Sequence, residues 1–174
     1  MLTAIMSLAV LQAASTEAAP FAPPRCDSEA HAAFDFWVGE WDVYPNGSDD
    51  LIARSRIERL YNGCAIRENW MPLGGRDGGS LNSLDPETGR WHQIWIGSAP
   101  GRVEFAGGPV GGKMVLTGWW PGAGGPGVDG LVRMTYSREQ GGAVRQHGEL
   151  STDHGLTWQP SFDFIYRPRG AAAD

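Results

Sequence analysis

Cysteine is scarce in this sequence, which has two, Cys26 and Cys64, among 174 residues. Two isolated cysteines and four scattered histidines lack the spacing of a zinc site, so no metal is predicted. Basic residues form no run, and the net charge is −6 at pH 7. A surface that binds nucleic acid needs clustered positive charge, so we predict no nucleic-acid partner.

Long apolar runs and the common catalytic motifs are also missing. The apolar stretch at residues 2–14 is shorter than the roughly 20 residues that a membrane-spanning helix needs. There is no G-x-S-x-G, no H-E-x-x-H and no phosphate-binding loop. No motif in the sequence therefore indicates a hydrolase of the G-x-S-x-G type, a metalloprotease or a nucleotide-binding protein.

The N-terminus has the character of a secretory signal peptide. Residues 2–14 are apolar and small residues follow them, which predicts a cleaved leader over residues 1–19 and a periplasmic or secreted protein. A positively charged start is missing, so a disordered or helical tail is the alternative. In an oxidising compartment, Cys26 and Cys64 are expected to form one disulfide.

The rest of the chain is predicted to form one domain. Residues 20–27 are expected to be extended, residues 28–169 to fold, and residues 170–174 to be a disordered tail. Once the leader is removed, no integral membrane segment is expected.

Glycine and tryptophan are what the sequence has in excess, with 25 and 8 residues. The glycines separate aromatic and β-branched runs whose apolar residues alternate, a pattern that predicts many short strands joined by tight turns. Ser28 is a candidate N-cap for a short helix over residues 28–38. The predicted strands cover residues 41–45, 51–60, 64–71, 79–84, 90–97, 102–107, 113–119, 130–137, 143–151 and 158–167.

Consecutive hairpins of this kind favour an up-and-down arrangement. Closure into a barrel removes exposed strand edges. The predicted fold class is therefore all-β: a single antiparallel barrel of about 8–10 strands with a short N-terminal helix.

Gly39-Glu40-Trp41, at the start of the first strand, resembles the G-x-W signature of lipocalins and other calycin-type barrels. The resemblance implies that Trp41 packs at the closed end of the barrel against an arginine after the last strand. Arg167 and Arg169 are the candidates. A guanidinium stacked on an indole contributes about 0.5–2 kcal/mol.

Three longer strings extend this resemblance: FDFWVGEWDV, SRIERLYNGCAIRENW and LDPETGRWHQIWI. They are similar to an uncharacterised family of secreted bacterial proteins, over most of residues 26–168. The resemblance implies a calycin-like barrel and brings no established activity. Haem-binding barrels of a related shape place a histidine near the end of the last strand, and this sequence has none there, so we predict no cofactor.

The string STDHGLTW, residues 151–158, resembles the Asp-box hairpin of sialidase propellers. Ser151 and Asp153 can bond to the loop backbone, Gly155 permits a tight turn and Trp158 covers it. A sialidase needs a much longer chain with several such boxes. We therefore predict a structural hairpin.

Aromatic and polar residues alternate within several strands, which is typical of a barrel with a mixed cavity. Glu68 and Arg133 are expected to form a buried pair that orients a polar group of a ligand. A packed core with the charges outside is the alternative. The predicted lining residues are Glu68, Trp70, Asn82, Gln93, Trp95 and Arg133.

The function that these features favour is binding of a small, partly apolar molecule inside the barrel. One alternative is a small hydrolase or isomerase that pairs Glu68 with His92 or His147 as acid and base. Another is a structural or interaction module with Trp119 and Trp120 as its contact patch. A filled interior favours the module, and an open one favours binding or catalysis.

Overall fold

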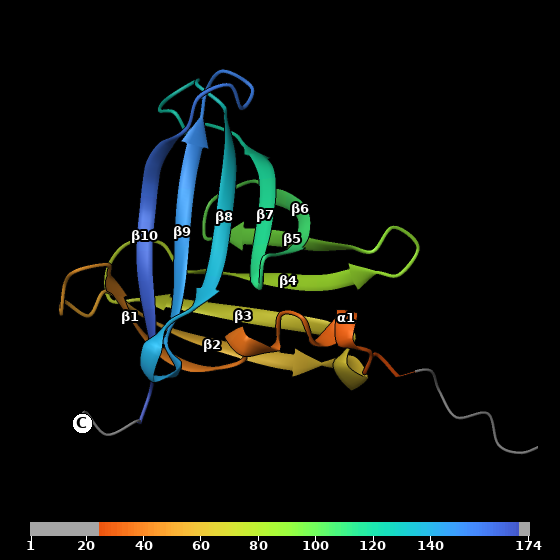
Figure 1. Ribbon diagram of the computed structural model, residues 1–174. Coiled ribbons are helices and arrows are strands. Elements are labelled where there is room, and N and C mark those ends of the chain that lie inside the picture. Colours follow the sequence, from red (N-terminus) through yellow and green to blue (C-terminus); the bar gives the residue numbers. More distant parts are fainter. Residues whose placement is uncertain (1–24, 171–174) are drawn as a thin grey trace, which may run out of the picture.

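A computed structural model describes residues 25–170 of the protein, which form a closed barrel of ten antiparallel strands (Figure 1). Each strand pairs with its neighbours in sequence, and β1 pairs with β10 to close the sheet. The predicted fold class is confirmed. The strands are β1 Gly39–Pro45, β2 Ala53–Leu60, β3 Ala65–Pro72, β4 Gly78–Asp85, β5 Arg90–Gly97, β6 Val103–Val110, β7 Lys113–Trp120, β8 Gly130–Arg138, β9 Val144–Ser151 and β10 Gln159–Pro168.

The predicted leader, residues 1–19, lies outside the described residues, as do residues 20–24 and 171–174. Within the described part of the chain, no helix has the length and apolar character to cross a membrane.

The sixth strand is longer than the sequence indicates. We expected it to end at residue 107, in a glycine-rich turn, but β6 continues to Val110 and pairs with β7 along the way. The turn lies instead at Gly111 and Gly112, whose φ angles are +57° and +77°. Two consecutive residues with positive φ match the twist of a tight hairpin, which explains the shift.

The N-terminal helix is also interrupted, contrary to the expectation of one helix over residues 28–38. Helix α1, Glu29–Ala32, is capped by Ser28, and a separate 3₁₀ turn covers Asp35–Trp37. Two short 3₁₀ turns lie elsewhere, at Tyr61–Gly63 and Gln140–Gly142. The break lets Phe34 and Trp37 both point into the barrel, where each is 0% exposed.

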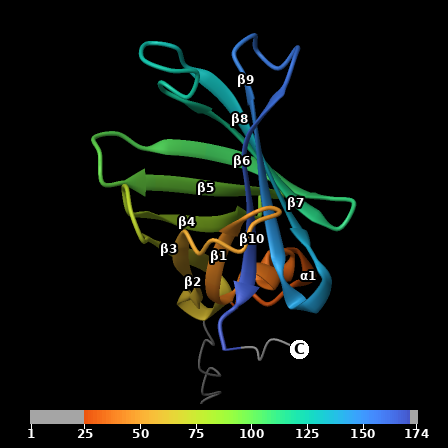
Figure 2. The same ribbon diagram turned by 90° about the vertical axis from the view of Figure 1, so that its left-hand side faces the viewer.

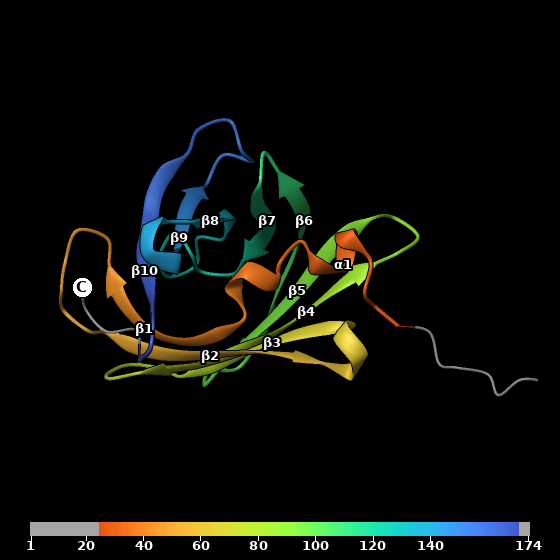
Figure 3. The same cartoon turned by 60° about the horizontal axis from the view of Figure 1, so that its bottom comes forward.

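The N-terminal segment closes one end of the barrel. Figure 3 shows this segment crossing the space between β2–β5 and β7–β10. The rings of Phe34 and Trp37 stack with centroids 5.0 Å apart, and Trp37 contacts the ring of Tyr136 at 4.9 Å. These rings fill the interior only at this end. At the opposite end, the interior is lined by strand side chains alone.

The opposite end is ringed by hairpin loops. Figure 2 shows the β7–β8 and β9–β10 loops extending beyond the barrel, on the side away from α1. The C-terminal ends of β3, β5 and β7 reach this same end, because alternate strands of an antiparallel sheet run the same way.

Trp41 is buried next to the N-terminal segment, and its indole N–H donates to the carbonyl oxygen of Trp37 at 2.9 Å. The expected stack on an arginine is wrong: among residues 25–170, no guanidinium lies over the Trp41 ring. Arg167 points outward from β10 and lies 4.3 Å from the centroid of Tyr44. Arg169 contributes its backbone N–H to the edge of β1.

Gly39 makes the burial of Trp41 possible. A Cβ atom at position 39 would lie 3.2 Å from two carbons of the indole ring, which is tighter than ordinary packing. The glycine of the G-x-W string therefore makes room for its tryptophan.

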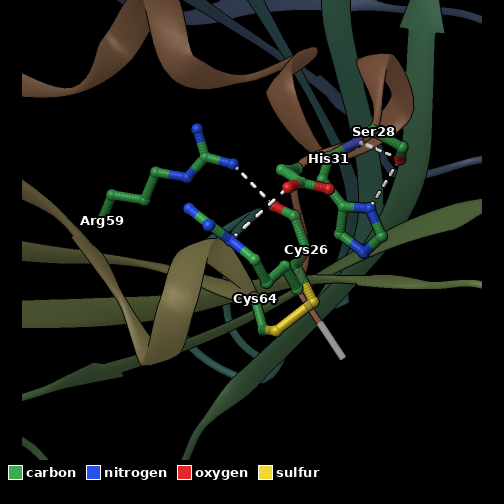
Figure 4. Close-up of a disulfide and its surroundings, with 7 residues drawn as sticks. Cys26, Ser28, His31, Arg59 and Cys64 are labelled. Atoms are coloured by element: carbon green, nitrogen blue, oxygen red, sulfur yellow. Dashed lines mark hydrogen bonds and ion pairs between the residues drawn. A yellow bond between two sulfur atoms is a disulfide. The ribbon is translucent and has the colours of Figure 1, made fainter. Parts of the chain in front are cut away.

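The predicted disulfide between Cys26 and Cys64 is present and ties the N-terminal segment to the start of β3 (Figure 4). Arg59 of β2 reinforces the same junction by donating to the carbonyl oxygen of Cys26 at 2.7 Å. Its guanidinium also pairs with Asp35. A covalent bond and an ion pair thus hold the segment that closes the barrel.

The disulfide closes a loop with a sequence separation of 38. Its loss is therefore expected to lower the free energy of unfolding by roughly 2–4 kcal/mol. Urea unfolding of oxidised protein, compared with the Cys26→Ser/Cys64→Ser variant, measures the difference. Equal midpoints for the two proteins would contradict a stabilising role for the bond.

Candidate functional site

A cavity of about 200 Å³ occupies the barrel interior toward the end away from α1. Most of its wall is aromatic, and the polar groups lie deeper. The lining residues are Glu68, Trp70, Gln93, Trp95, Phe105, Trp120, Met134, Tyr136, Gln146, Phe162, Phe164 and Tyr166.

Four of the six predicted lining residues lie on this wall: Glu68, Trp70, Gln93 and Trp95. The alternation within β3 and β5 points them inward, as the period of two indicates. Asn82, a fifth predicted residue, is 0% exposed and bonds to Gln93. The structure therefore brings these five together, while their role in binding stays a prediction.

Arg133 is the exception, and its expected pairing with Glu68 is wrong. It lies on the outer face of β8 and pairs with Glu149 of β9 at 2.9 Å. Its guanidinium also lies 4.1 Å from the centroid of Trp158. The physical reason is strand parity, because Met134 and Tyr136 take the inward positions of β8 and leave Arg133 outside.

The alternative pairing of Glu68 with a histidine is not found within residues 25–170. His92 is exposed on the outer face of β5. His147 alternates with the inward-facing Gln146 in β9 and faces outward. Within residues 25–170, no histidine lines the cavity, and no group of three His, Cys, Asp or Glu side chains could hold a metal ion.

Several residues that line the cavity were not among the predicted site residues. Tyr136, Gln146 and Tyr166 supply polar groups from β8, β9 and β10, and the same alternation places them inward. The signal was the inward face of each later strand, opposite the charged residues. The missed aromatic residues are Phe105, Trp120, Phe162 and Phe164.

A chain of hydrogen bonds runs from Glu68 across β4 to β5. The Ser80 hydroxyl donates to Oε2 of Glu68 at 3.0 Å. The Asn82 side-chain amide donates to Ser80 Oγ at 3.1 Å and to the carbonyl oxygen of Ile66 at 3.0 Å. Gln93 donates to Oδ1 of Asn82 at 2.8 Å. Glu68 is therefore anchored to a fixed polar scaffold.

A second group of hydrogen bonds covers the opposite wall. The Tyr166 hydroxyl donates to Oε1 of Gln146 at 2.7 Å. The Gln146 amide donates to the Tyr136 hydroxyl at 2.9 Å, and Gln93 approaches the same hydroxyl at 3.5 Å. These contacts connect the two groups across the barrel floor.

Glu68 is 5% exposed and has no cationic partner among residues 25–170. Burial raises the pKa of its carboxyl to about 7, although the hydroxyls of Ser80, Ser55 and Tyr166 act in the opposite direction. Burial also raises the pKa of Tyr136 and of Tyr166, and the nearby Glu68 charge adds to both shifts. The two phenols are thus neutral near pH 7, and Glu68 is poised between its two forms.

Glycines on the strands allow the large rings to pack flat against the sheet. A Cβ atom at Gly148 would lie 2.4 Å from the ring of Phe162, and one at Gly78 would lie 2.7 Å from the ring of Trp95. Larger residues at these positions would push both rings into the cavity. Part of the glycine excess is therefore used to shape the cavity rather than to make turns.

A second groove of about 330 Å³ adjoins the cavity and shares Trp95 and Trp120 with it. Arg76, Asp77 and Arg102 border this groove, which gives the rim charges of both signs. Arg102 is paired with Glu104 at 2.7 Å.

The 151–158 hairpin has the internal bonding expected of an Asp-box turn. The Ser151 hydroxyl accepts from the backbone N–H of Gly155 at 2.8 Å, and the Trp158 indole N–H donates to the carbonyl oxygen of Gly155 at 3.1 Å. Asp153 accepts from the Thr157 hydroxyl and backbone, and these bonds lower the pKa of Asp153 to about 2. None of these residues lines the cavity.

No family model matches the chain, and no curated protein matches it either.

Replacing Glu68 by glutamine is expected to remove a pH-dependent loss of stability. The pKa of about 7 in the folded protein lies above the ordinary glutamate value of 4.5. The stabilisation contributed by protonated Glu68 is therefore complete below pH 4.5 and is lost as the pH rises through 7. Between pH 4.5 and 8.5 the wild type should lose about 3 kcal/mol relative to Glu68→Gln. Urea unfolding across this range measures the difference.

Glu149→Gln is the matched control, because Arg133 holds the pKa of Glu149 below its ordinary value. This variant should be less stable than the wild type, by nearly the same amount at pH 5.5 and pH 8.5. A constant difference between wild type and Glu68→Gln would contradict the burial of an unpaired carboxyl.

Asp153→Ala is expected to lower the melting temperature, because the hairpin loses the acceptor for Thr157. Binding of a molecule in the cavity should be unchanged. Differential scanning fluorimetry and a binding assay separate the two effects. Lost binding with an unchanged melting temperature would place the hairpin in the site instead.

Proposed function

We propose that the barrel binds one small, partly apolar molecule in the cavity around Glu68. The observation that carries this proposal is an open, aromatic-walled interior with a buried carboxyl and amide groups at its floor. Ligand sites combine apolar walls with a few polar groups in this way. A cavity of about 150 Å³ in another protein holds benzene, so about 200 Å³ suits a single substituted ring.

The cavity argues against a purely structural module. Trp119 is 46% exposed on the outer face of β7, whereas Trp120 lines the cavity. Adjacent strand residues point to opposite faces, so these two tryptophans do not form one contact patch. The open interior favours a ligand.

Catalysis has weaker support than binding. Glu68 has a pKa of about 7, a value suited to proton transfer. However, within the described residues the other titratable groups of the cavity wall are Tyr136 and Tyr166, whose pKa values are raised well above 10. The site therefore lacks a second group that would exchange a proton near neutral pH.

An exported location is part of the proposal. Disulfides persist mainly in oxidising compartments, and the Cys26–Cys64 bond supports a periplasmic or secreted site of action. Kinship with the secreted bacterial family resembled by the FDFWVGEWDV string is likewise proposed. The closed barrel and the buried Trp41 support a calycin-like relationship.

Protein purified from its own host is expected to carry a small molecule, which native mass spectrometry detects. In the purified protein, Trp95→Ala should weaken the binding of benzyl alcohol about tenfold or more, since each 1.4 kcal/mol of lost contact is tenfold in Kd. Ligand-observed NMR gives the affinities.

Trp119→Ala is the matched control, since it removes the same side chain from the outer face of the barrel. Its affinity for benzyl alcohol should equal that of the wild type. The proposed function fails if no molecule co-purifies and benzyl alcohol shows no saturable binding, or if both variants lose affinity equally.

A further inference from the structure

The cavity contains a carboxyl group but no positive charge. Glu68 is the one Asp or Glu on the wall within residues 25–170, and neither Arg, Lys nor His lines that wall. Its Oε2 atom accepts from Ser80, a neutral hydroxyl. Hydrogen bonds alone leave a buried carboxylate poorly compensated, since a buried charge is normally paired.

The groups that face Glu68 from neighbouring strands are all uncharged near neutral pH. Ser55 of β2 and Ser80 of β4 present hydroxyls, and Tyr166 of β10 presents a phenol. Tyr136 of β8 faces the same interior. Arg59 of β2 pairs with Asp35 of the N-terminal segment. The other charged residues of β2 and β3, apart from Glu68 itself, lie on the outer face in cross-strand pairs: Arg54 with Asp42, Arg56 with Glu40, and Arg67 with Glu58.

The walls above Glu68 are suited to a cation as well as to apolar groups. Trp70 lies two positions beyond Glu68 on the same face of β3, and Trp95 and Trp120 extend the wall toward the mouth. Phe164 packs against Trp70 with ring centroids 5.8 Å apart. The negative π faces of such rings attract ammonium groups, and Trp does so most strongly.

We propose that the molecule bound in this cavity is a small amine whose ammonium group lies against Glu68 and whose apolar body lies between Trp70 and Trp95. This inference rests on the proposed function and names the chemical class of its ligand. The ammonium supplies the counter-charge that no side chain of the cavity wall provides within residues 25–170, and it donates hydrogen bonds to the carboxylate. The net charge of −6 also favours the approach of cations over anions.

The size of the cavity limits the amine. About 200 Å³ admits one ring with a short substituent, so benzylamine is a suitable probe. Benzyl alcohol and benzoate have nearly the same shape and differ in charge. Comparison of the three therefore isolates the contribution of the ammonium group.

The test is calorimetric titration of the purified protein with benzylamine, benzyl alcohol and benzoate at pH 5.5 and pH 8. Benzylamine is expected to bind about tenfold or more tightly than benzyl alcohol at pH 8, and benzoate most weakly. Because the amine needs ionised Glu68, its affinity should fall roughly 30-fold at pH 5.5, given a pKa of about 7. Benzyl alcohol should show little change with pH.

Glu68→Gln should remove both the preference for the amine over the alcohol and its pH dependence. Glu149→Gln, an outer-face carboxyl paired with Arg133, should leave both unchanged. Circular dichroism in the near ultraviolet checks that each variant retains wild-type packing.

The failures of the two proposals are distinguishable. If benzyl alcohol or benzoate binds as tightly as benzylamine at pH 8, the amine inference is overturned while the cavity remains a ligand site. A preference for benzylamine that survives Glu68→Gln overturns it as well. If none of the three probes binds, the amine inference fails, and the proposed function fails with it when no molecule co-purifies either.

Discussion

The size of a ten-strand barrel is the constraint on which the rest of the structure depends. Closing ten strands encloses more space than the smallest barrels, whose side chains just fill the interior. Phe34 and Trp37 fill one end, held there by the Cys26–Cys64 disulfide and by Arg59. No equivalent segment within residues 25–170 fills the other end, and the cavity lies there.

Charged side chains are divided between the two faces of the barrel wall. Ion pairs connect neighbouring strands on the outer face, where Arg54, Arg56, Arg67, Arg133 and Arg145 each pair with a carboxylate. Glu68 alone carries a titratable carboxyl on the wall of the cavity among the described residues. Its hydrogen bonds hold it in place without supplying a counter-charge, and this is the basis for the proposed cationic ligand.

The strand pattern was predictable because a period of two, broken by glycine-rich turns, determines both strand positions and faces. The inward positions of Glu68, Trp70, Gln93 and Trp95 follow from that pattern alone. The partner of Glu68 did not follow from the pattern. The prediction rested on the general rule that a buried charge is paired, but whether Arg133 can reach Glu68 depends on which face of β8 it occupies. Arg133 occupies the outward parity of β8, where Glu149 and Trp158 satisfy it. The break in the N-terminal helix was not predictable from the sequence, since it follows from ring packing at Phe34 inside the closed barrel.

Glu68 is a buried carboxyl without a cationic partner among residues 25–170, and we propose that it binds the ammonium group of a ligand. Carbon-13 NMR titration of the Glu68 side-chain carboxyl, with and without saturating benzylamine, tests this proposal most directly. The account predicts a pKa of about 7 in the free protein and a clear decrease when benzylamine is bound. A pKa near the ordinary glutamate value in the free protein, or one that benzylamine leaves unchanged, would contradict the account.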